Sequence, residues 1–522
     1  MSSSDSLVSQ PVAQSAERAR WKHLWVILAV FLLLAAIYLP FVVSYQFLWD
    51  DYPIVNIARQ ESPQTMVTSL RYVSTFGVLY WRPLAKATVA LNYSVSRAGP
   101  TAYALTDFAL HLAVVALVYM LMWRVSRHHI LSGFAAVLFG VHQAAASPAL
   151  WLGARQETLP TLWTLLAVIS FLSYLKAAGR KGSAAWGILT LLCQAAALAS
   201  KESAVILPGI LAAAILLHRK DDQPRRPMLV KAGGLIACSV GIVVLWWLFR
   251  SALGPSSVKL PILEVGLVNG LAEAGRHALT HLAALFSPVD MSAWILMTRE
   301  LSGYSVVMGI VGLFLSVSLF VALARWQQRR VPSLFPVWGV RLAFFAIAWL
   351  AVTLLPDVFL GVPGKWRAYT PLVGAVILTT VFLVALTGLV STYVSSRPAR
   401  YLLATLIGVF LLSHVVQNIR SNALLIREGA EWNTTVEKVV SDMNAERVRT
   451  GGRPVDLLIR TPAEGLLPLF ANHLQQAVEL RTGLLPSSVQ VVLGGQCPGK
   501  PDTSCVDISG IVEKSLQHVR GL

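Results

Sequence analysis

Two adjacent carboxylates, Asp50 and Asp51, follow directly after the first long apolar segment of the chain. A charged side chain at a membrane boundary is costly unless it faces water, a partner or a substrate. Either carboxylate could instead cap a helix that lies along the interface. The pair is nevertheless the strongest candidate in the first hundred residues for catalytic chemistry.

More polar side chains are expected on the same membrane face as this pair. They are Arg82, His142, Arg155, Glu157, Lys201, Glu202, Lys365, Arg367 and Tyr369. Each has an ordinary alternative: a basic side chain can anchor to headgroups, a histidine can pack between helices, and Arg155 with Glu157 could form an internal ion pair. Their shared location makes the functional interpretation stronger than it would be for any one of them.

A carboxylate beside several cations suits transfer of a sugar from a lipid phosphate to a hydroxyl. The carboxylate would accept the proton of the hydroxyl. The cations, preferably arginines with their forked donors, would stabilise the departing phosphate. The donor's lipid tail would also require a groove that opens to the bilayer.

The elements that must position these residues are membrane helices. The chain has 522 residues, of which 55% are hydrophobic and only 13% are charged, whereas soluble domains carry about 25% charged residues. We predict an all-α polytopic membrane protein with about eleven transmembrane helices. Apolar runs place them near 24–45, 103–123, 130–148, 158–176, 183–200, 203–218, 232–250, 303–323, 338–356, 367–389 and 401–419.

The net charge of +17 is explained by topology rather than by nucleic-acid binding. Basic clusters recur between the predicted spans, and all fall on one side if the N-terminus is cytoplasmic. The catalytic candidates then lie on the outer side. No partner nucleic acid is expected, and the absence of repeats and of a eukaryotic retention signal favours a bacterial inner membrane.

The predicted organisation has three parts. Residues 1–23 form a disordered cytoplasmic N-terminus, and residues 24–419 form the transmembrane domain, with long outer loops at 46–102 and 251–302. Residues 420–522 form a small extracytoplasmic α/β domain that includes a strand at Val455–Ile459. In this domain Cys497 and Cys505 bracket a short polar loop, and we predict a disulfide between them, as suits an oxidising compartment.

Five stretches resemble the GT-C superfamily of polytopic glycosyltransferases, in particular its protein O-mannosyltransferase-like branch, whose members often carry tetratricopeptide repeats. The stretches are Phe47–Tyr52, Tyr80–Leu84 with Leu91-Asn92, Leu138–His142 running on to Trp151–Glu157, Leu198–Pro208, and Arg367–Gly374. They cover about the first 210 residues and a patch near residue 370. The order of the set is more specific than the Asp-Asp pair alone.

The resemblance implies a polyprenyl-phosphate-linked sugar donor, with mannose as a candidate sugar, and a hydroxyl acceptor on a protein or glycan. By resemblance, Asp50 is the base, Asp51 orients it or binds the acceptor, and Glu157 contacts the acceptor or sugar or orients a cation. Arg82, Lys201 and Arg367 hold the phosphate, and the reaction inverts the anomeric centre. No cofactor is implied with certainty, although a divalent metal ion is compatible with the resemblance because metal use varies in the superfamily.

Two alternatives to the enzyme remain. A transporter or flippase of lipid-linked sugars would be expected to place its charges near the bilayer midplane, whereas those predicted here lie at one rim. A non-catalytic envelope-glycan assembly protein of the same fold is the other. It is suggested by two departures from the family pattern, Ala145 in place of a second histidine and Ser147 in place of an acidic residue.

Overall fold

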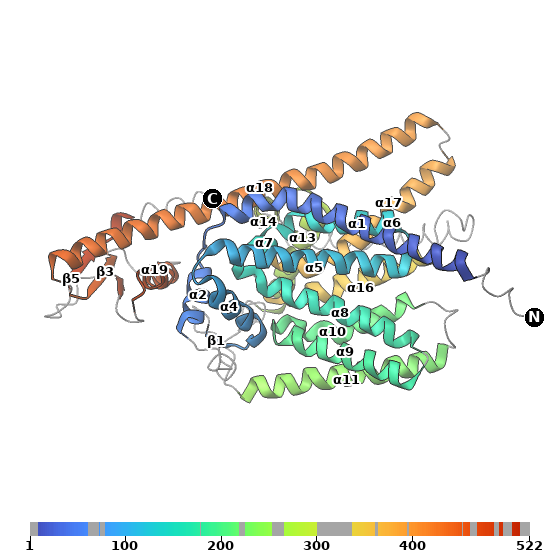
Figure 1. The fold of residues 1–522 in the computed structure, drawn as a ribbon, viewed down its shortest axis with the longest axis horizontal. Coiled ribbons are helices and arrows are strands. Elements are labelled where there is room, and N and C mark those ends of the chain that lie inside the picture. Colours follow the sequence, from blue (N-terminus) through green and yellow to red (C-terminus); the bar gives the residue numbers. More distant parts are fainter. Residues whose placement is uncertain are drawn as a thin grey trace, which may run out of the picture.

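A computed structural model shows a mostly helical chain with a small parallel sheet near the C-terminus (Figure 1). The residues that the structure describes are 9–60, 72–73, 79–177, 179–218, 225–252, 266–299, 337–360, 364–393, 396–451, 453–459, 467–484, 490–493 and 504–511.

The apolar runs form long helices, and α5 and α18 have a proline at their first or second residue, where its fixed φ suits the first helical turn. These helices are α1 (Ser9–Ser44), α5 (Pro100–Ser126), α8 (Arg155–Lys176), α9 (Arg180–Leu198), α11 (Arg225–Ala252), α16 (Val337–Leu360), α17 (Tyr369–Tyr393) and α18 (Arg397–Arg449). Shorter helical segments lie between them: α6 (His129–Val141), α7 (Gln143–Leu150), η1 (Leu152–Ala154), η2 (Glu202–Ile206), α10 (Leu207–Ala214), η3 (Ile215–Leu217), α13 (Leu267–Phe286), α14 (Met291–Arg299) and η4 (Lys365–Ala368).

Among the described residues, seven helices are long and apolar enough to cross a membrane, and an eighth span results if α6 and α7 count as one. These helices are those expected of an integral membrane protein. The predicted count of eleven is unconfirmed. The segment Glu202–Leu217 is apolar but shorter than a usual span, and the span predicted at 303–323 lies outside the described residues.

The span predicted at 130–148 is bent, with 69° between α6 and α7. His142 has extended backbone angles at the break, and its Nδ1 accepts a hydrogen bond from the N–H of Ala144 at 3.1 Å. The side chain therefore caps α7 and satisfies one of the donors that a new helix leaves open.

The predicted boundary at residue 420 lies within a single helix. Helix α18 is continuous over 53 residues, which corresponds to about 80 Å, far more than the roughly 30 Å of a hydrocarbon core. It runs along the bundle formed by the other long helices, which we call the helical body, and continues beyond it to the C-terminal elements (Figure 1). There β3 (Val455–Ile459), at the predicted strand, pairs in parallel with β4 (Val491–Leu493) and β5 (Ser504–Asp507), and α19 (Leu467–Thr482) lies nearby.

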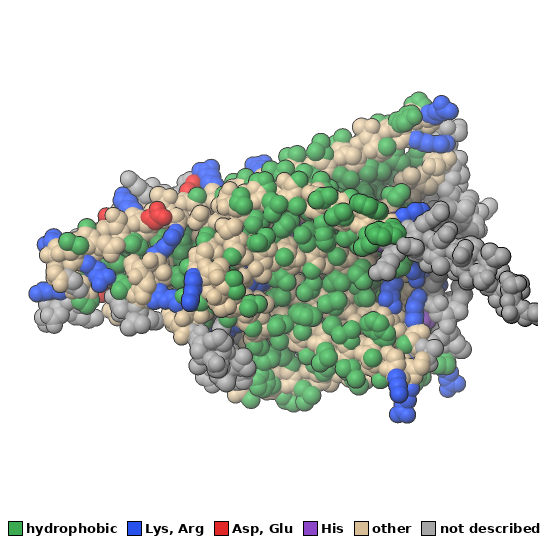
Figure 2. Space-filling model, in the orientation of Figure 1, with side chains coloured by type: hydrophobic (Ala, Val, Ile, Leu, Met, Phe, Trp, Pro, Cys, Tyr) green, Lys and Arg blue, Asp and Glu red, His purple; other side chains and the backbone are tan. Residues whose placement is uncertain are grey.

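The short elements after α1 lie at the end of the helical body that faces the C-terminal elements, opposite the N-terminus (Figure 1). They are α2 (Asp51–Gln60), the antiparallel strands β1 (Tyr72–Val73) and β2 (Leu79–Tyr80), and α4 (Pro83–Ser96). In Figure 2 a largely hydrophobic surface covers the helical body, and lysine and arginine side chains gather toward its two ends.

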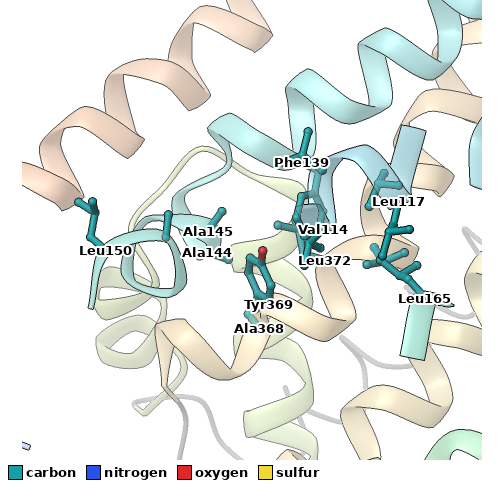
Figure 3. Close-up of a cluster of buried hydrophobic side chains, with 14 of the residues drawn as sticks. Val114, Leu117, Phe139, Ala144, Ala145, Leu150, Leu165, Ala368, Tyr369 and Leu372 are labelled. Carbon is teal, nitrogen blue, oxygen red and sulfur yellow. The ribbon is translucent and has the colours of Figure 1, made fainter. Parts of the chain in front are cut away.

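The interior of the helical body is packed with aliphatic and aromatic side chains, including Phe139, Leu165, Tyr369 and Leu372 (Figure 3). Helices approach closely where a side chain is absent. A Cβ on Gly374 of α17 would lie 2.9 Å from the carbonyl oxygen of Ala346 in α16, closer than real contacts allow. This glycine therefore sets the spacing between the two helices that carry Asp357 and Tyr369.

Candidate functional site

Asp51 is a buried carboxylate that fixes the start of α2. Its Oδ2 accepts hydrogen bonds from the Tyr45 hydroxyl and, at 2.9 Å, from the N–H of Leu48, while its Oδ1 accepts one from the N–H of Gly153 at 3.0 Å. Burial raises the pKa of Asp51 to about 7, although these three donors act in the opposite direction. We call Asp50 and Asp51 the acidic motif. The Asp51 side chain thus joins this motif to the segment that leads into α8.

Asp50 has a different environment from its neighbour. Its side chain is 45% exposed, whereas Asp51 is 0% exposed. The polar contact that the structure gives to Asp50 is with Nε2 of His473, 3.1 Å from Oδ1. Of the two predicted catalytic carboxylates, Asp50 is therefore the one that a substrate can reach.

Arg82 stands immediately before α4 and faces two other elements. Its guanidinium binds Glu202, with Nη2 2.7 Å and Nε 3.0 Å from Oε2, and it also donates to Oε1 of Gln156. The start of α4 is held by a hydrogen bond from the N–H of Leu84 to the carbonyl of Ala199, at 3.0 Å. Arg82 and Glu202 are thereby brought together, as their predicted shared location requires.

Lys201 and Glu157 form a second ion pair beside the first. Asp357 and Arg367 form a third, with 3.6 Å between Oδ1 and Nη1, and both act electrostatically on Glu157. We call Arg82, Glu157, Lys201, Glu202, Asp357 and Arg367 the rim cluster, because all six lie at or beside helix ends. Carboxylates and cations are equal in number there, so each cation is held by a carboxylate of the protein.

Residues 151–157, which we call the junction segment, connect the acidic motif to the rim cluster. Gly153 binds Asp51, Gln156 binds Arg82, and Glu157 binds Lys201. Trp151 packs edge-on against Trp366 of η4, with 5.1 Å between ring centroids. This segment, itself part of the third family-like stretch, thus contacts the first, second and fourth stretches and the residue just before the fifth.

Lys365 lies in η4 and pairs with Asp290, with 2.9 Å between Nζ and Oδ2. Asp290 also accepts from Gln417 of α18 at 3.3 Å. Lys365 is therefore not bound to a member of the rim cluster, although Arg367, two residues later, belongs to it.

Three predicted site residues are engaged inside the helical body. The hydroxyl of Tyr369 donates to Nδ1 of His111 at 2.8 Å, and Nε2 of His142 donates to the carbonyl of Leu285 at 3.2 Å. Arg155 is buried and does not pair with Glu157. All three of its nitrogens bind protein atoms, and Nε lies 2.5 Å from Oδ1 of Asp107.

The sequence interpretation did not include Asp107, Gln156, Asp290, Asp357 or His473. Asp107 could have been found, because a carboxylate within a predicted span is itself a functional signal, and Asp357 lies one residue beyond the span predicted at 338–356. Gln156 lies within the family-like stretch Trp151–Glu157 but was not singled out as a site residue. Asp290 and His473 carry no local signal, since their roles depend on which helices meet in space.

Among the described residues, no group of three or more His, Cys, Asp and Glu side chains is arranged to hold a metal ion. Metal use therefore stays open. Cys193 and Cys238 are free thiols and Cys505 is disulfide-bonded. The predicted partner Cys497 lies outside the described residues, so the Cys497–Cys505 pairing stays a prediction.

No family model matches the chain. Over 174 residues, 31% of this chain, it is 33% identical to mouse protein O-mannosyl-transferase TMTC3, and it is 31% identical to the human protein of the same name. The matched segment makes up only 18% and 19% of those relatives, so the chain covers less than a fifth of their length.

Two solved structures share a weaker overall likeness. ArnT from Cupriavidus metallidurans bound to undecaprenyl phosphate is 13% identical, with a TM-score of 0.45 over 94% of this chain and 90% of that chain. The Archaeoglobus fulgidus oligosaccharyltransferase in the apo form is 12% identical, with a TM-score of 0.43 over 77% and 56%. The resemblance that the motifs predicted is confirmed at the level of sequence: over 31% of its length the chain is similar to protein O-mannosyl-transferases.

Proposed function

We propose that the chain is a membrane glycosyltransferase that moves a sugar from a polyprenyl-phosphate donor to a hydroxyl acceptor. The junction segment carries this proposal, because it connects the Asp50-Asp51 pair, through Asp51, to two cations, Arg82 and Lys201. The similarity to proteins named O-mannosyl-transferases supports the same class and makes mannose the first sugar to test.

In the proposed reaction, Asp50 accepts the proton of the acceptor hydroxyl as its oxygen attacks the anomeric carbon. The bond between that carbon and the phosphate oxygen breaks on the opposite face, so the anomeric configuration inverts. The phosphate leaves with the bonding electron pair, and Arg82, Lys201 and Arg367 stabilise its charge. Asp51 holds the start of α2 and thereby fixes the position of Asp50.

The rim cluster suits a phosphate that must bind and later leave. Its cations are already held by Glu202, Glu157 and Asp357, so they lose little conformational freedom when the donor binds. A phosphate would share these cations with the carboxylates. Since the cluster balances its own charges, product release would not leave a set of uncompensated cations.

The proposed topology places the site on the outer face of a bacterial inner membrane. The basic segments between spans would lie in the cytoplasm with residues 1–23. Residues 24–419 would form the transmembrane domain, and residues 420–522 would lie in the periplasm. The acceptor, on a protein or a glycan, would reach Asp50 from that side, and the lipid of the donor would enter from the bilayer.

The decisive variant is Asp50→Asn, which removes the base with little change in shape. We expect turnover to fall by about 10²- to 10⁴-fold, while the KM for the donor and the thermal stability stay close to wild type. The assay uses purified protein in nanodiscs, radiolabelled polyprenyl-phosphate mannose and an envelope extract as acceptor, with products identified by mass spectrometry.

Two results would overturn the proposal. Unchanged turnover in Asp50→Asn would remove Asp50 as the base. If the wild type transfers no sugar but moves lipid-linked sugar across vesicles, and Asp50→Asn blocks that movement, a transporter is the better description.

A further inference from the structure

The C-terminal helix α19 is docked against α2, the helix that begins at the acidic motif. The buried side chain of Asn56 in α2 donates to Oε2 of Glu479 at 3.0 Å and to Oε1 of Gln476 at 2.5 Å. Arg59, one turn later, donates to the carbonyl oxygens of Glu479 at 2.6 Å and Gly483 at 3.0 Å. These contacts hold α19 beside α2 over about one turn in the second half of α2.

An aromatic group closes the end of this interface nearest the acidic motif. Trp49 stacks on Trp432 of α18, with 4.8 Å between ring centroids and 19° between ring planes. Phe470 of α19 meets Trp432 edge-on at 4.9 Å and Trp49 at 5.8 Å. The residue immediately before Asp50 is therefore held by two elements of the C-terminal region.

His473 lies one turn after Phe470, and the packing of the aromatic side chains does not explain the position of its imidazole. Its side chain is 1% exposed, and Nε2 lies 3.1 Å from Oδ1 of Asp50. In the described part of the chain, neither ring nitrogen has a regular hydrogen-bond partner. A buried polar group without such a partner is costly and rare, so an imidazole directed at one carboxylate needs a specific reason.

Resting on the glycosyltransferase function proposed above, we infer that His473 is a positioning residue for Asp50 and that α19 completes the active site. The imidazole N–H engages Oδ1 of Asp50 and leaves Oδ2 directed toward the acceptor hydroxyl. Asp50 follows a loop with no regular structure and is half exposed, so it would otherwise sample several rotamers. A general base works well only when it is held within hydrogen-bond reach of the proton it accepts.

The test compares three variants of the full-length protein in the transfer assay. His473→Ala should lower kcat by about 10- to 100-fold and change the donor KM less than about twofold. His473→Gln, whose amide N–H can occupy a similar position, should recover at least about one third of wild-type kcat. Leu474→Ala is the matched control, since Leu474 is its neighbour on α19 and is buried at 0% exposure. It should loosen the packing of α19 without changing the contact with Asp50, and it should keep most of the turnover.

The inference is overturned if His473→Ala keeps kcat within about twofold of wild type, if His473→Gln is no better than His473→Ala, or if Leu474→Ala loses as much kcat as His473→Ala. Thermal unfolding of Asp50→Asn, His473→Ala and the double variant separates this inference from the proposed function. Non-additive Tm shifts, by about 1–2 °C, support the pairing even if no sugar transfer is found. Additive shifts contradict the pairing even if transfer is found.

Discussion

The rim cluster and the Arg155–Asp107 pair use the same residue types at different places in the fold. Arg155 and Asp107 have side chains that are 2% and 0% exposed, whereas Arg82 and Glu202 are 11% and 28% exposed. Arg155 is also bound at every nitrogen by residues of its own helical body. An ion pair sealed in the interior contributes to the fold, and one that opens to solvent at helix ends can exchange partners with a ligand.

The largest effect on stability is expected from breaking the Arg155–Asp107 pair. Asp107→Ala leaves the Arg155 guanidinium buried without its counter-ion, which should lower the free energy of unfolding by about 3–5 kcal/mol. Thermal unfolding in detergent and the yield of monodisperse protein would measure this loss. The double variant Asp107→Leu/Arg155→Met should recover much of the stability, because it removes both charges. A single variant as stable as wild type would show that the pair does not hold the body together.

Asp51 differs from both pairs because it is buried with hydrogen-bond donors rather than with a cation. Its pKa in the folded protein, about 7, lies above its ordinary value of 3.8, so the folded state binds the proton more tightly. This contribution to stability is complete below about pH 4 and is lost as the pH rises through 7, by up to about 4 kcal/mol.

Asp51→Asn should therefore flatten the dependence of Tm on pH between 4 and 8. Parallel curves for wild type and Asp51→Asn would show that this carboxyl does not titrate in that range.

The smallest change in stability is expected at the Arg82–Glu202 pair, where the change in donor binding should nevertheless be clear. Arg82→Gln should raise the KM for the polyprenyl-phosphate donor by about 10- to 100-fold, because one charge-assisted contact to the phosphate is lost. Its effect on stability should stay below about 1 kcal/mol. Arg97→Gln, an exposed arginine at the other end of α4, is the control. Equal donor KM values in the two variants would exclude Arg82 from phosphate binding.

Most helices could be predicted from the sequence because long apolar runs have few alternatives in a membrane. The predicted runs at 103–123 and 232–250 fall within α5 and α11. The boundary predicted at residue 420 falls inside α18, which is continuous there, and the division into domains stays a prediction. Composition changes there because α18 passes from apolar to polar surroundings, and a helix makes its own backbone hydrogen bonds in both.

The partners within the site were harder to predict. The predicted topology placed Arg82, Glu157, Lys201 and Glu202 on one face, and in the structure they form two neighbouring ion pairs. Arg155 falls in the same motif but turns into the helical body, because residues two apart on a helix face different directions. The contact between Asp50 and His473 joins residues more than 400 positions apart, and no local pattern encodes it. The roles of all these residues in catalysis stay predictions.

Because α18 is one unbroken helix, its length sets the orientation of the elements that follow it. Each residue added to an α-helix turns everything beyond it by about 100° and moves it by about 1.5 Å. A single insertion near the middle of α18 would therefore point Trp432 and the elements that follow away from Trp49, although the change in reach would be small. The contact between the helical body and the C-terminal region therefore depends on the rotational phase of α18 as much as on its length.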